Sequence, residues 1–391
     1  MIDIEKIRAE TPGIQFSTHL LACGSSLMPQ RVVDVILEHT QLEALMGGYE
    51  AEAKKIDDLN KIYDIVAEHI GANSHEIALM ENSTVAWSHA FYSLPLKSGS
   101  RILTSEAEYA ANYVAFLQRA KRDNLTIDII PSDQNGTLDT NALEAMVDER
   151  VGLIAISWIP TNGGLVNPAE NVGKVAKKYN IPYLLDACQA AGQMQIDVNK
   201  IQCDFLSATG RKFLRGPRGT GFLYINEKWL GTIEPAMIDH FGAPWVKKNV
   251  YELREDARRF ETWENSYALR AGLGEAIKYA EEIGIDLIHE RVQLLAKFNR
   301  DLLSEIKNIQ LRDIGTEQCG IISFSIDEKN DPKEIVDQMS KAGFAIGLVD
   351  PESTLIDSER RSLPTLLRMA PHYYNTEDEI EKAVKQVSLL L

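Results

Sequence analysis

The stretch from Asp204 to Gly221 reads DFLSATGRKFLRGPRGTG and joins an apolar run to a small-residue turn and a lysine. Thr209 and Gly210 precede Arg211 and Lys212, so the lysine stands where the backbone can come close to a ligand. A small hydroxyl, a glycine and an arginine suit a turn that binds phosphate. A single lysine after an arginine is ordinarily a surface group, but the complete string predicts a lysine that binds a ligand.

Short apolar runs alternate with helical patterns on both sides of this stretch. The runs have the length of strands, and helical segments such as Thr140–Val147 and Val172–Tyr179 separate them. This alternation predicts an α/β fold with a mostly parallel sheet, whose ligands bind at the carboxyl ends of the strands. The predicted strands are Arg101–Thr104, Thr126–Ile130, Gly152–Trp158 and Tyr183–Asp186.

The pattern changes after residue 265, which predicts a second domain. A long helical stretch, Gly274–Leu303, precedes two strand-like runs, Gly320–Ile326 and Gly343–Gly347, and a terminal helix. We therefore expect a large domain over residues 20–265 and a smaller α+β C-terminal domain over residues 266–391. Residues 1–19 are expected to pack on the smaller domain.

Composition limits the partners and the compartment. The 391 residues carry a formal net charge of -16, which argues against a nucleic-acid partner. The sequence has no apolar stretch of about 18 residues and no apolar signal region near Met1. We therefore expect a cytoplasmic protein without a membrane span. The four cysteines form no CxxC motif, and no histidine cluster has metal-ligand spacing, so no metal is expected; the cysteines are Cys23, Cys188, Cys203 and Cys319.

The string from Asp204 to Gly221 resembles, without a gap, the lysine signature of the class V aminotransferases. This family includes cysteine desulfurases and isopenicillin N epimerases. The resemblance extends over most of the chain. It implies a pyridoxal-phosphate (PLP) transferase of fold type I, in which Lys212 holds the cofactor as a Schiff base. It also implies a small amino-acid substrate, and a homodimer, because the family builds its sites at a subunit interface.

Further matches to the family assign the other cofactor contacts. In Tyr183–Gln189 (YLLDACQ), Asp186 resembles the aspartate that keeps the pyridine nitrogen protonated. Gln189 resembles the residue that contacts the phenolic oxygen. Taken alone, Asp186 is equally typical of a helix cap after a strand. The predicted phosphate contacts come from a helix N-terminus and from the lysine string: Asn82, Ser83, Thr84, Thr209 and Arg211.

Two residues at other predicted strand ends complete the resemblance around the cofactor. Tyr109, in Glu108–Asn112 (EYAAN), aligns with an aromatic residue that stacks on the cofactor ring. Desulfurases carry histidine there, and a phenol is a poorer proton shuttle at neutral pH. Asn162, in Pro160–Gly164 (PTNGG), resembles a second contact of the phenolic oxygen, although asparagine also suits a turn before glycines. The residues predicted to be catalytic are Lys212, Asp186 and Tyr109.

The substrate site is expected near the C-terminus. Arg368, in the stretch LRMAPHYYNT, resembles the arginine that pairs with the substrate's α-carboxylate. Cysteine desulfurases carry a nucleophilic cysteine upstream of this arginine, whereas Gly347–Leu363 contains none. Cys23 lies in a segment that resembles a substrate-facing part of the family, and the alternative is a small buried thiol. Glu234–Glu255 is expected either to contribute to the pocket or to pack between subunits.

The string from Arg259 to Glu264 (RFETWE), together with PTNGG and GRK, resembles a narrower branch of the family. That branch contains isopenicillin N epimerase-like proteins and hercynylcysteine sulfoxide lyases. It implies a carbon–sulfur lyase that acts on a cysteine conjugate or its sulfoxide and gives pyruvate and ammonia. An epimerase would need a second acid on the opposite face of the substrate, and an aminotransferase would need a keto-acid acceptor. A protein that keeps the fold only as a binding scaffold is the remaining alternative.

Overall fold

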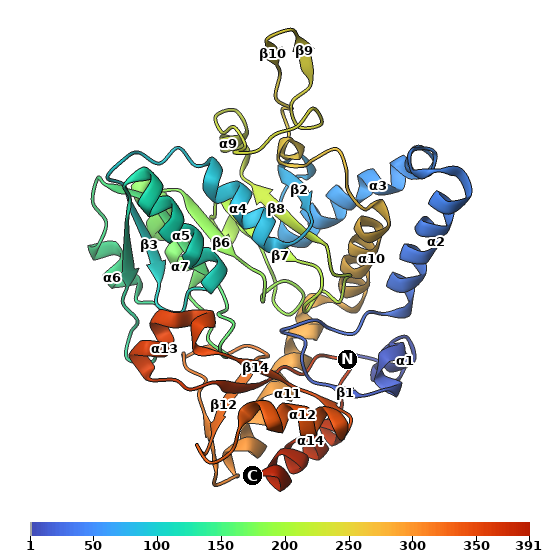
Figure 1. Ribbon diagram of the computed structural model, residues 1–391, viewed down its shortest axis with the longest axis vertical. Coiled ribbons are helices and arrows are strands. Elements are labelled where there is room, and N and C mark those ends of the chain that lie inside the picture. The colour runs from blue at the N-terminus through green and yellow to red at the C-terminus, as the bar shows by residue number, and fades with distance from the viewer. Residues whose placement is uncertain (1) are drawn as a thin grey trace.

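A seven-stranded sheet forms the centre of the larger domain in the computed structural model, which describes residues 2–391 (Figure 1). Five neighbouring strands are parallel, and β8 is antiparallel to both of its neighbours. The predicted α/β fold with a mostly parallel sheet is therefore confirmed. In spatial order the strands are β2 (Ile77–Met80), β8 (Gly221–Ile225), β7 (Phe205–Thr209), β6 (Tyr183–Asp186), β5 (Val151–Ser157), β3 (Arg101–Ser105) and β4 (Thr126–Ile130).

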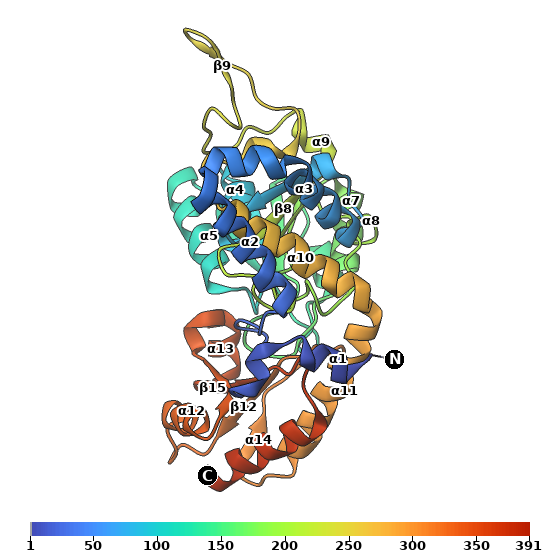
Figure 2. The same cartoon turned by 90° about the vertical axis from the view of Figure 1, so that its right-hand side faces the viewer.

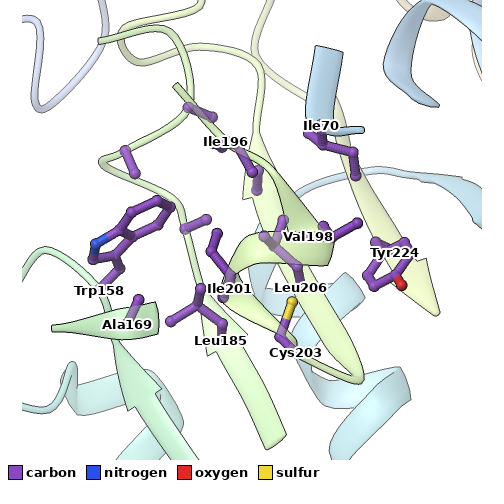
Figure 3. Close-up of a cluster of buried hydrophobic side chains, with 14 of the residues drawn as sticks. Ile70, Trp158, Ala169, Leu185, Ile196, Val198, Ile201, Cys203, Leu206 and Tyr224 are labelled. Atoms are coloured by element: carbon purple, nitrogen blue, oxygen red, sulfur yellow. The ribbon is translucent and has the colours of Figure 1, made fainter. Parts of the chain in front are cut away.

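Helices cover both faces of this sheet because successive strand residues point to opposite sides. In β6, Tyr183 and Leu185 belong to one apolar cluster, whereas Leu184 belongs to another. Figure 3 shows part of the first cluster, where Leu185 and Leu206 lie close to Ile201. The helices of the first face are α3 (Gly48–Ile70), α6 (Thr140–Ala145), α7 (Ala169–Tyr179), α8 (Val198–Ile201) and α10 (Tyr267–Ile283); those of the second are α4 (Ser83–Ser93), α5 (Ala110–Asp123) and α9 (Glu227–Leu230).

Helix α10 packs with the large domain, against α2 (Gln30–Met46) and α3. Leu273 and Ile277 of α10 are buried in the same cluster as the apolar residues of α3. The boundary predicted at residue 265 therefore separates α10 from the helices it contacts, and a boundary at Gly284 would keep them together. That glycine has a φ of 94°, and it divides the long helical stretch predicted over Gly274–Leu303 into α10 and a second helix.

The smaller domain is built on an antiparallel sheet of four strands, with α11, α12 and α14 packed around it (Figures 1 and 2). Its central strand β15 pairs with β12 on one side and β14 on the other. The bounds are α11 (Ile285–Ser304), β11 (Ile309–Leu311), β12 (Ile322–Ile326), α12 (Pro332–Lys341), β13 (Phe344–Ala345), β14 (Gly347–Val349), a 3-10 helix η4 (Pro351–Thr354), α13 (Leu355–Arg361), β15 (Leu366–Met369) and α14 (Glu377–Leu390).

The N-terminal segment lies against the small domain. Strand β1 (Thr18–His19) pairs in parallel with β13, and α1 (Ile4–Ala9) carries Arg8, which bonds the carbonyl of Tyr374 and the carboxylate of Glu379. At the other end of the molecule, a hairpin of β9 (Trp245–Lys247) and β10 (Val250–Tyr251) projects away from the body (Figures 1 and 2). Within residues 2–391, no helix combines the length and the apolar character needed to cross a membrane.

Candidate active site

A cavity of about 700 Å³ lies where the strands of the large sheet end and the small domain begins. Its walls come from the turns that follow β2, β3, β5, β6 and β7, and from β14, η4 and β15 of the small domain. Parallel strands bring their carboxyl ends to the same edge, which explains why distant segments meet here. The predicted site residues that line the cavity are Cys23, Asn82, Ser83, Thr84, Tyr109, Asp186, Gln189, Thr209, Arg211, Lys212 and Arg368.

Lys212 stands on the turn that follows β7. Among residues 2–391 its ammonium group has no hydrogen-bond or ion-pair partner, so it is free to react with a group inside the cavity. The turn is tight: a Cβ atom on Gly210 would collide with Thr220 Oγ1. The carbonyl of Lys212 accepts a 3.0 Å hydrogen bond from the backbone N–H of Arg215, which closes the turn after the lysine.

Arg215 anchors this turn to both ends of the chain. It adopts the left-handed conformation, with φ at 60°, and its side chain is fully buried. The guanidinium donates to the Leu27 carbonyl, the Thr11 hydroxyl and the Tyr373 hydroxyl at 2.8, 2.7 and 2.9 Å, and it lies 4.7 Å from the ring centroid of Tyr374. Burial of a cation is costly unless its donors are satisfied, and these contacts satisfy them.

Asp186 lies at the end of β6 with its carboxylate held from two sides. Oδ1 accepts a hydrogen bond of 2.9 Å from the N–H of Cys188, and Oδ2 accepts one of 3.0 Å from the amide of Asn112. The residue is 7% exposed. These donors fix the orientation of the carboxylate, as a residue that pairs with a protonated pyridine nitrogen requires.

Glu108 forms a second, fully buried carboxylate behind Asp186. It accepts hydrogen bonds from the Tyr109 N–H, from the Asn112 amide, from the Thr104 hydroxyl and from both the N–H and the hydroxyl of Ser157. Burial raises the pKa of Glu108, and the charge of Asp186 adds to this effect. Sequence analysis gave Glu108 no role. The available signal was its spacing of four residues from Asn112, which lies in the first turn of α5, while Glu108 stands just before that helix.

The turn between β2 and α4 offers an anion-binding helix N-terminus. Asn82 caps α4 by accepting from the N–H of Val85 at 2.9 Å, and the hydroxyls of Ser83 and Ser207 are hydrogen-bonded at 3.1 Å. The first N–H groups of a helix have no partner within the helix, and its dipole favours an anion there. The cation of Arg211 lines the same cavity. This arrangement suits a phosphate group.

Gln189 supplies a buried polar atom that still needs a partner. Its Nε2 donates to the carbonyl of Cys23 at 3.2 Å, whereas its Oε1 is buried and has no partner within residues 2–391. Buried polar atoms are normally satisfied, so this oxygen is suited to a ligand in the cavity. Together, a free lysine, an oriented aspartate, an anion site and an orphaned amide oxygen fit pyridoxal phosphate.

Arg368 reaches the cavity from β15 of the small domain. Its Nη1 donates to both the carbonyl and the hydroxyl oxygen of Thr161, at 2.6 and 2.7 Å. Its Nε has no partner among residues 2–391. One nitrogen thus fixes the guanidinium while the others stay available, which suits a bidentate contact with a carboxylate.

Asn162 is not among the residues that line the cavity, so its position gives no support to the predicted cofactor contact. Its amide instead donates a 2.8 Å hydrogen bond to Asp357 of α13. The neighbouring residue, Thr161, faces the cavity in its place. The sequence does not predict a role for Thr161, because nothing in the PTNGG string distinguishes the residue that points inward from the one that points toward α13.

Tyr109 stands at the cavity with 39% of its surface exposed. Burial of the hydroxyl raises its pKa. The phenol therefore keeps its proton at neutral pH, which agrees with a stacking role better than with a proton shuttle. Glu234–Glu255 contributes no residue to this cavity, so packing between subunits is the remaining prediction for that segment.

Two of the four free cysteines line the cavity, Cys23 and Cys188, while Cys203 and Cys319 are buried elsewhere. Burial raises the pKa of the Cys188 thiol, which disfavours the nucleophilic thiolate. Within residues 2–391, no group of three or more His, Cys, Asp or Glu side chains could hold a metal ion.

The Arg259–Glu264 string has a structural role in the large domain. Glu261 is 3% exposed; one of its oxygens accepts from the N–H of Leu79 at 3.0 Å, and the other pairs with Arg270 at 2.8 Å. It supports β2, the strand that leads to the anion-binding turn. A string with this supporting role carries little information about the substrate.

The family model described as aminotransferase class V matches residues 18–383. A probable cysteine desulfurase of Methanothermobacter thermautotrophicus is 26% identical over 382 residues, covering 96% of this chain and 95% of the relative. One of Borreliella burgdorferi is 29% identical over 370 residues, covering 88% and 85%. These relatives are not from the hercynylcysteine sulfoxide lyase or isopenicillin N epimerase branch, so the narrower resemblance is not supported.

Solved structures show the same fold over the whole chain. The apo cysteine desulfurase of Thermococcus onnurineus NA1 superposes with a TM-score of 0.93 at 25% identity, covering 100% of this chain and 98% of that one. The cystine C–S lyase C-DES, in complex with cysteine persulfide, gives a TM-score of 0.86 at 20% identity, covering 97% and 99%. The chain therefore belongs to the class-V aminotransferase family and is a pyridoxal-phosphate enzyme of fold type I.

Proposed function

We propose that the protein is a carbon–sulfur lyase that removes the sulfur group from an S-substituted cysteine by β-elimination. Cysteine S-conjugates, cysteine sulfoxides and hercynylcysteine sulfoxide are the candidate substrates. The products would be pyruvate, ammonia and the sulfur-containing leaving group. We also propose that the enzyme acts as a homodimer, as the family resemblance implies.

One observation carries this proposal. The small-domain wall of the cavity, formed by β14 and η4, contributes Leu348, Val349 and Ser353 and no cysteine. A desulfurase needs a nucleophilic cysteine that takes sulfur from the substrate. An elimination needs none, because the sulfur group departs with the electrons of the broken carbon–sulfur bond.

Three charged residues of the cavity, Arg368, Asp186 and Lys212, have roles in this reaction. When bound, pyridoxal phosphate supplies an electron sink that makes bonds at the substrate's α-carbon easier to break. Arg368 fixes the amino acid through its carboxylate. Asp186 keeps a positive charge on the pyridine nitrogen by electrostatic attraction. Lys212 would hold the cofactor through its aldehyde, and its free amine would take the α-proton of the bound substrate.

The remaining residues bind and position. The turn Asn82–Thr84, with Thr209 and Arg211, contacts the phosphate, and Gln189 contacts the phenolic oxygen. Tyr109 packs on the ring face. Cys23 contacts the substrate from the N-terminal segment without acting as a nucleophile. The proton that Lys212 takes can return to the departing sulfur group, so charge balances. The released 2-aminoacrylate hydrolyses in water to pyruvate and ammonia.

The test is pyruvate and ammonia release from a panel of cysteine S-conjugates and sulfoxides, with Lys212→Ala as the control. We expect release from at least one member of the panel, and a fall of at least about a hundredfold in Lys212→Ala, because positioned proton transfer typically contributes this much. Absence of pyruvate with every member of the panel contradicts the proposal. Exchange of the α-proton in heavy water would then identify an epimerase, and a keto-acid-dependent reaction an aminotransferase.

The names of the relatives favour a second candidate, a cysteine desulfurase. It would have to use Cys23 or Cys188, the cysteines that line the cavity within residues 2–391. L-Cysteine with a thiol reductant separates the two candidates, because a desulfurase gives alanine and sulfide, whereas a β-lyase gives pyruvate and sulfide. Alanine as the main product would favour the desulfurase.

A further inference from the structure

A buried polar contact joins the two domains beside the cavity. Asn162 Nδ2, on the turn after β5, donates to Asp357 Oδ2 of α13 at 2.8 Å. Asn162 and Asp357 are 6% and 1% exposed, so the hydrogen bond between them is shielded from water. Arg361, one turn further along α13, adds an ion pair of 3.0 Å with the same carboxylate oxygen. A hydrogen bond to a buried charge is among the stronger single contacts in a protein.

A second contact holds α13 from a different side. Arg360 Nη1 lies 2.8 Å from Glu106 Oε2, which follows β3 of the large domain. Arg360 also lies 3.7 Å from the second oxygen of Asp357. Asp357 is thus the point where the small domain's α13 meets a donor of the large domain and two cations of its own helix.

Helix α13 continues directly from the wall of the cavity. The chain runs from β14 through η4 into α13, and Leu348, Val349 and Ser353 of this run line the cavity. In the sheet, Gly347 of β14 lies opposite Arg368 of β15. The wall therefore stands beside the arginine that would hold the substrate's carboxylate, and any movement of α13 moves the wall.

We propose that Asp357 is a positioning residue that sets the size of the sulfur substituent which the cavity accepts. Its contact with Asn162 fixes α13 and keeps Val349 and Ser353 close to Arg368. This inference rests on the lyase activity proposed above, because it assigns the wall to the substrate's side chain. When the contact is broken, the wall retracts and larger substituents fit.

The experiment compares three variants of the full-length holoenzyme. Asn162→Asp places a second carboxylate against that of Asp357 and removes the amide donor of their hydrogen bond. The double variant Asn162→Asp with Asp357→Asn exchanges donor and acceptor, and restores an amide–carboxylate pair. Asn171→Asp, on α7, makes the same change at an asparagine that bonds Lys174 away from this cavity, and it controls for the added charge.

Two substrates, S-methyl-L-cysteine and S-benzyl-L-cysteine, report on the wall. We expect Asn162→Asp to raise the ratio of kcat/KM for the benzyl over the methyl compound by at least about tenfold, the discrimination that small changes in an apolar pocket produce. The kcat for the methyl compound should stay near that of the parent. Hydrogen exchange of peptides over residues 347–363 should become faster. The double variant should reverse both effects in part, because it restores the hydrogen bond but not the ion pair of Asp357 with Arg361.

Faster hydrogen exchange in Asn162→Asp without a changed kcat/KM ratio would overturn the proposal. A double variant that restores neither the exchange rate nor the ratio, even in part, would also overturn it. Thermal melting separates a local effect from general unfolding. If the parent turns over neither compound, the lyase assignment is decided separately, by the full panel of conjugates and sulfoxides described above. The wall is then judged by the apparent Kd of the two amino acids, measured from the visible absorbance of the cofactor. If Asn162→Asp changes the apparent Kd of both amino acids by the same factor, the proposed role of the wall is overturned.

Discussion

The side-chain amide of Asn112 donates a 3.0 Å hydrogen bond to Asp186, the carboxylate at the end of β6. The same nitrogen lies 2.9 Å from Oε1 of Glu108, so one amide separates two buried carboxylates. The charge of Asp186 contributes to the raised pKa of Glu108, which shows that the two groups interact electrostatically. Asn112 thus orients Asp186 toward the cavity and screens it from Glu108.

Asn112→Leu should weaken catalysis without unfolding the protein. Loss of a hydrogen bond to a charged group costs about 1.5–3 kcal/mol, so we expect kcat/KM to fall by about 10- to 100-fold. Affinity for the cofactor, measured by titrating the apoenzyme with pyridoxal phosphate, should fall as well. Asn171→Leu, at an exposed position of α7, is the control. An Asn112→Leu protein with the parent's kcat/KM would contradict the role of this amide.

The Thr161 hydroxyl should matter for substrate binding, because it holds Arg368 at 2.7 Å. Thr161→Val keeps the shape and the backbone carbonyl contact but removes the hydroxyl. We expect KM to rise about tenfold, the effect of one hydrogen bond to a charged group, with a smaller change in kcat. Thr161→Ser retains the hydroxyl and should behave like the parent. Equal KM values in the valine and serine variants would show that the hydroxyl does not position Arg368.

Stability should decrease as the pH falls below the ordinary pKa of histidine. His372 is fully buried, and its Nε2 lies 2.7 Å from the carbonyl of Phe213, to which it donates. Burial, with the charge of Arg215, lowers the pKa of His372 well below its usual value. Near pH 5 the unfolded chain therefore binds a proton that the folded protein excludes, and folding loses up to about 2 kcal/mol relative to pH 7.

His372→Gln isolates this effect, because glutamine keeps a donor but does not titrate. Burial also lowers the pKa values of His19 and His89, and both histidines are present in the parent and in the variant. Urea unfolding at pH 7 and pH 5 should show a smaller loss of stability in His372→Gln than in the parent. Equal losses in the two proteins would mean that His372 accepts a proton in the folded state.

Cysteine should be dispensable for elimination. The double variant Cys23→Ala, Cys188→Ala removes both thiols that line the cavity. The proposed reaction uses neither thiol as a nucleophile, so pyruvate release from the best conjugate should persist, with loss of the Cys23 contact affecting KM more than kcat. The single variants identify which thiol matters if the rate falls. Loss of activity in Cys23→Ala alone, with a persulfide on Cys23 detected by mass spectrometry in the parent, would instead favour the desulfurase.

The sequence was sufficient to predict the fold, the cofactor and the residues that stand directly at strand ends. Lys212 follows β7 and Asp186 ends β6, so strand polarity alone brings them to one edge. Thr161 and Asn162 show where such reasoning stops. Neighbouring side chains in a turn point in different directions, and contacts with Arg368 and Asp357, remote in sequence, decide which one faces the cavity.

Helix α10 gives a second example. Its sequence predicts a helix with a buried face, but not the domain against which that face packs. The domain that receives this face is decided by α2 and α3, which lie far earlier in the chain. Glu108 illustrates the same limit at the scale of one side chain, since its five donors come from β3, β5 and α5 as well as from its own turn.

The anchoring of Arg215 has a consequence for how the enzyme matures during synthesis. Three residues after the reactive lysine, this side chain needs Thr11 and Leu27, which leave the ribosome early, and Tyr373, which leaves it late. The large sheet can therefore assemble while translation continues. The turn that carries Lys212 is fully anchored only after Tyr373 has been synthesised. We expect a nascent chain arrested before Tyr373 to bind pyridoxal phosphate less tightly than the released protein.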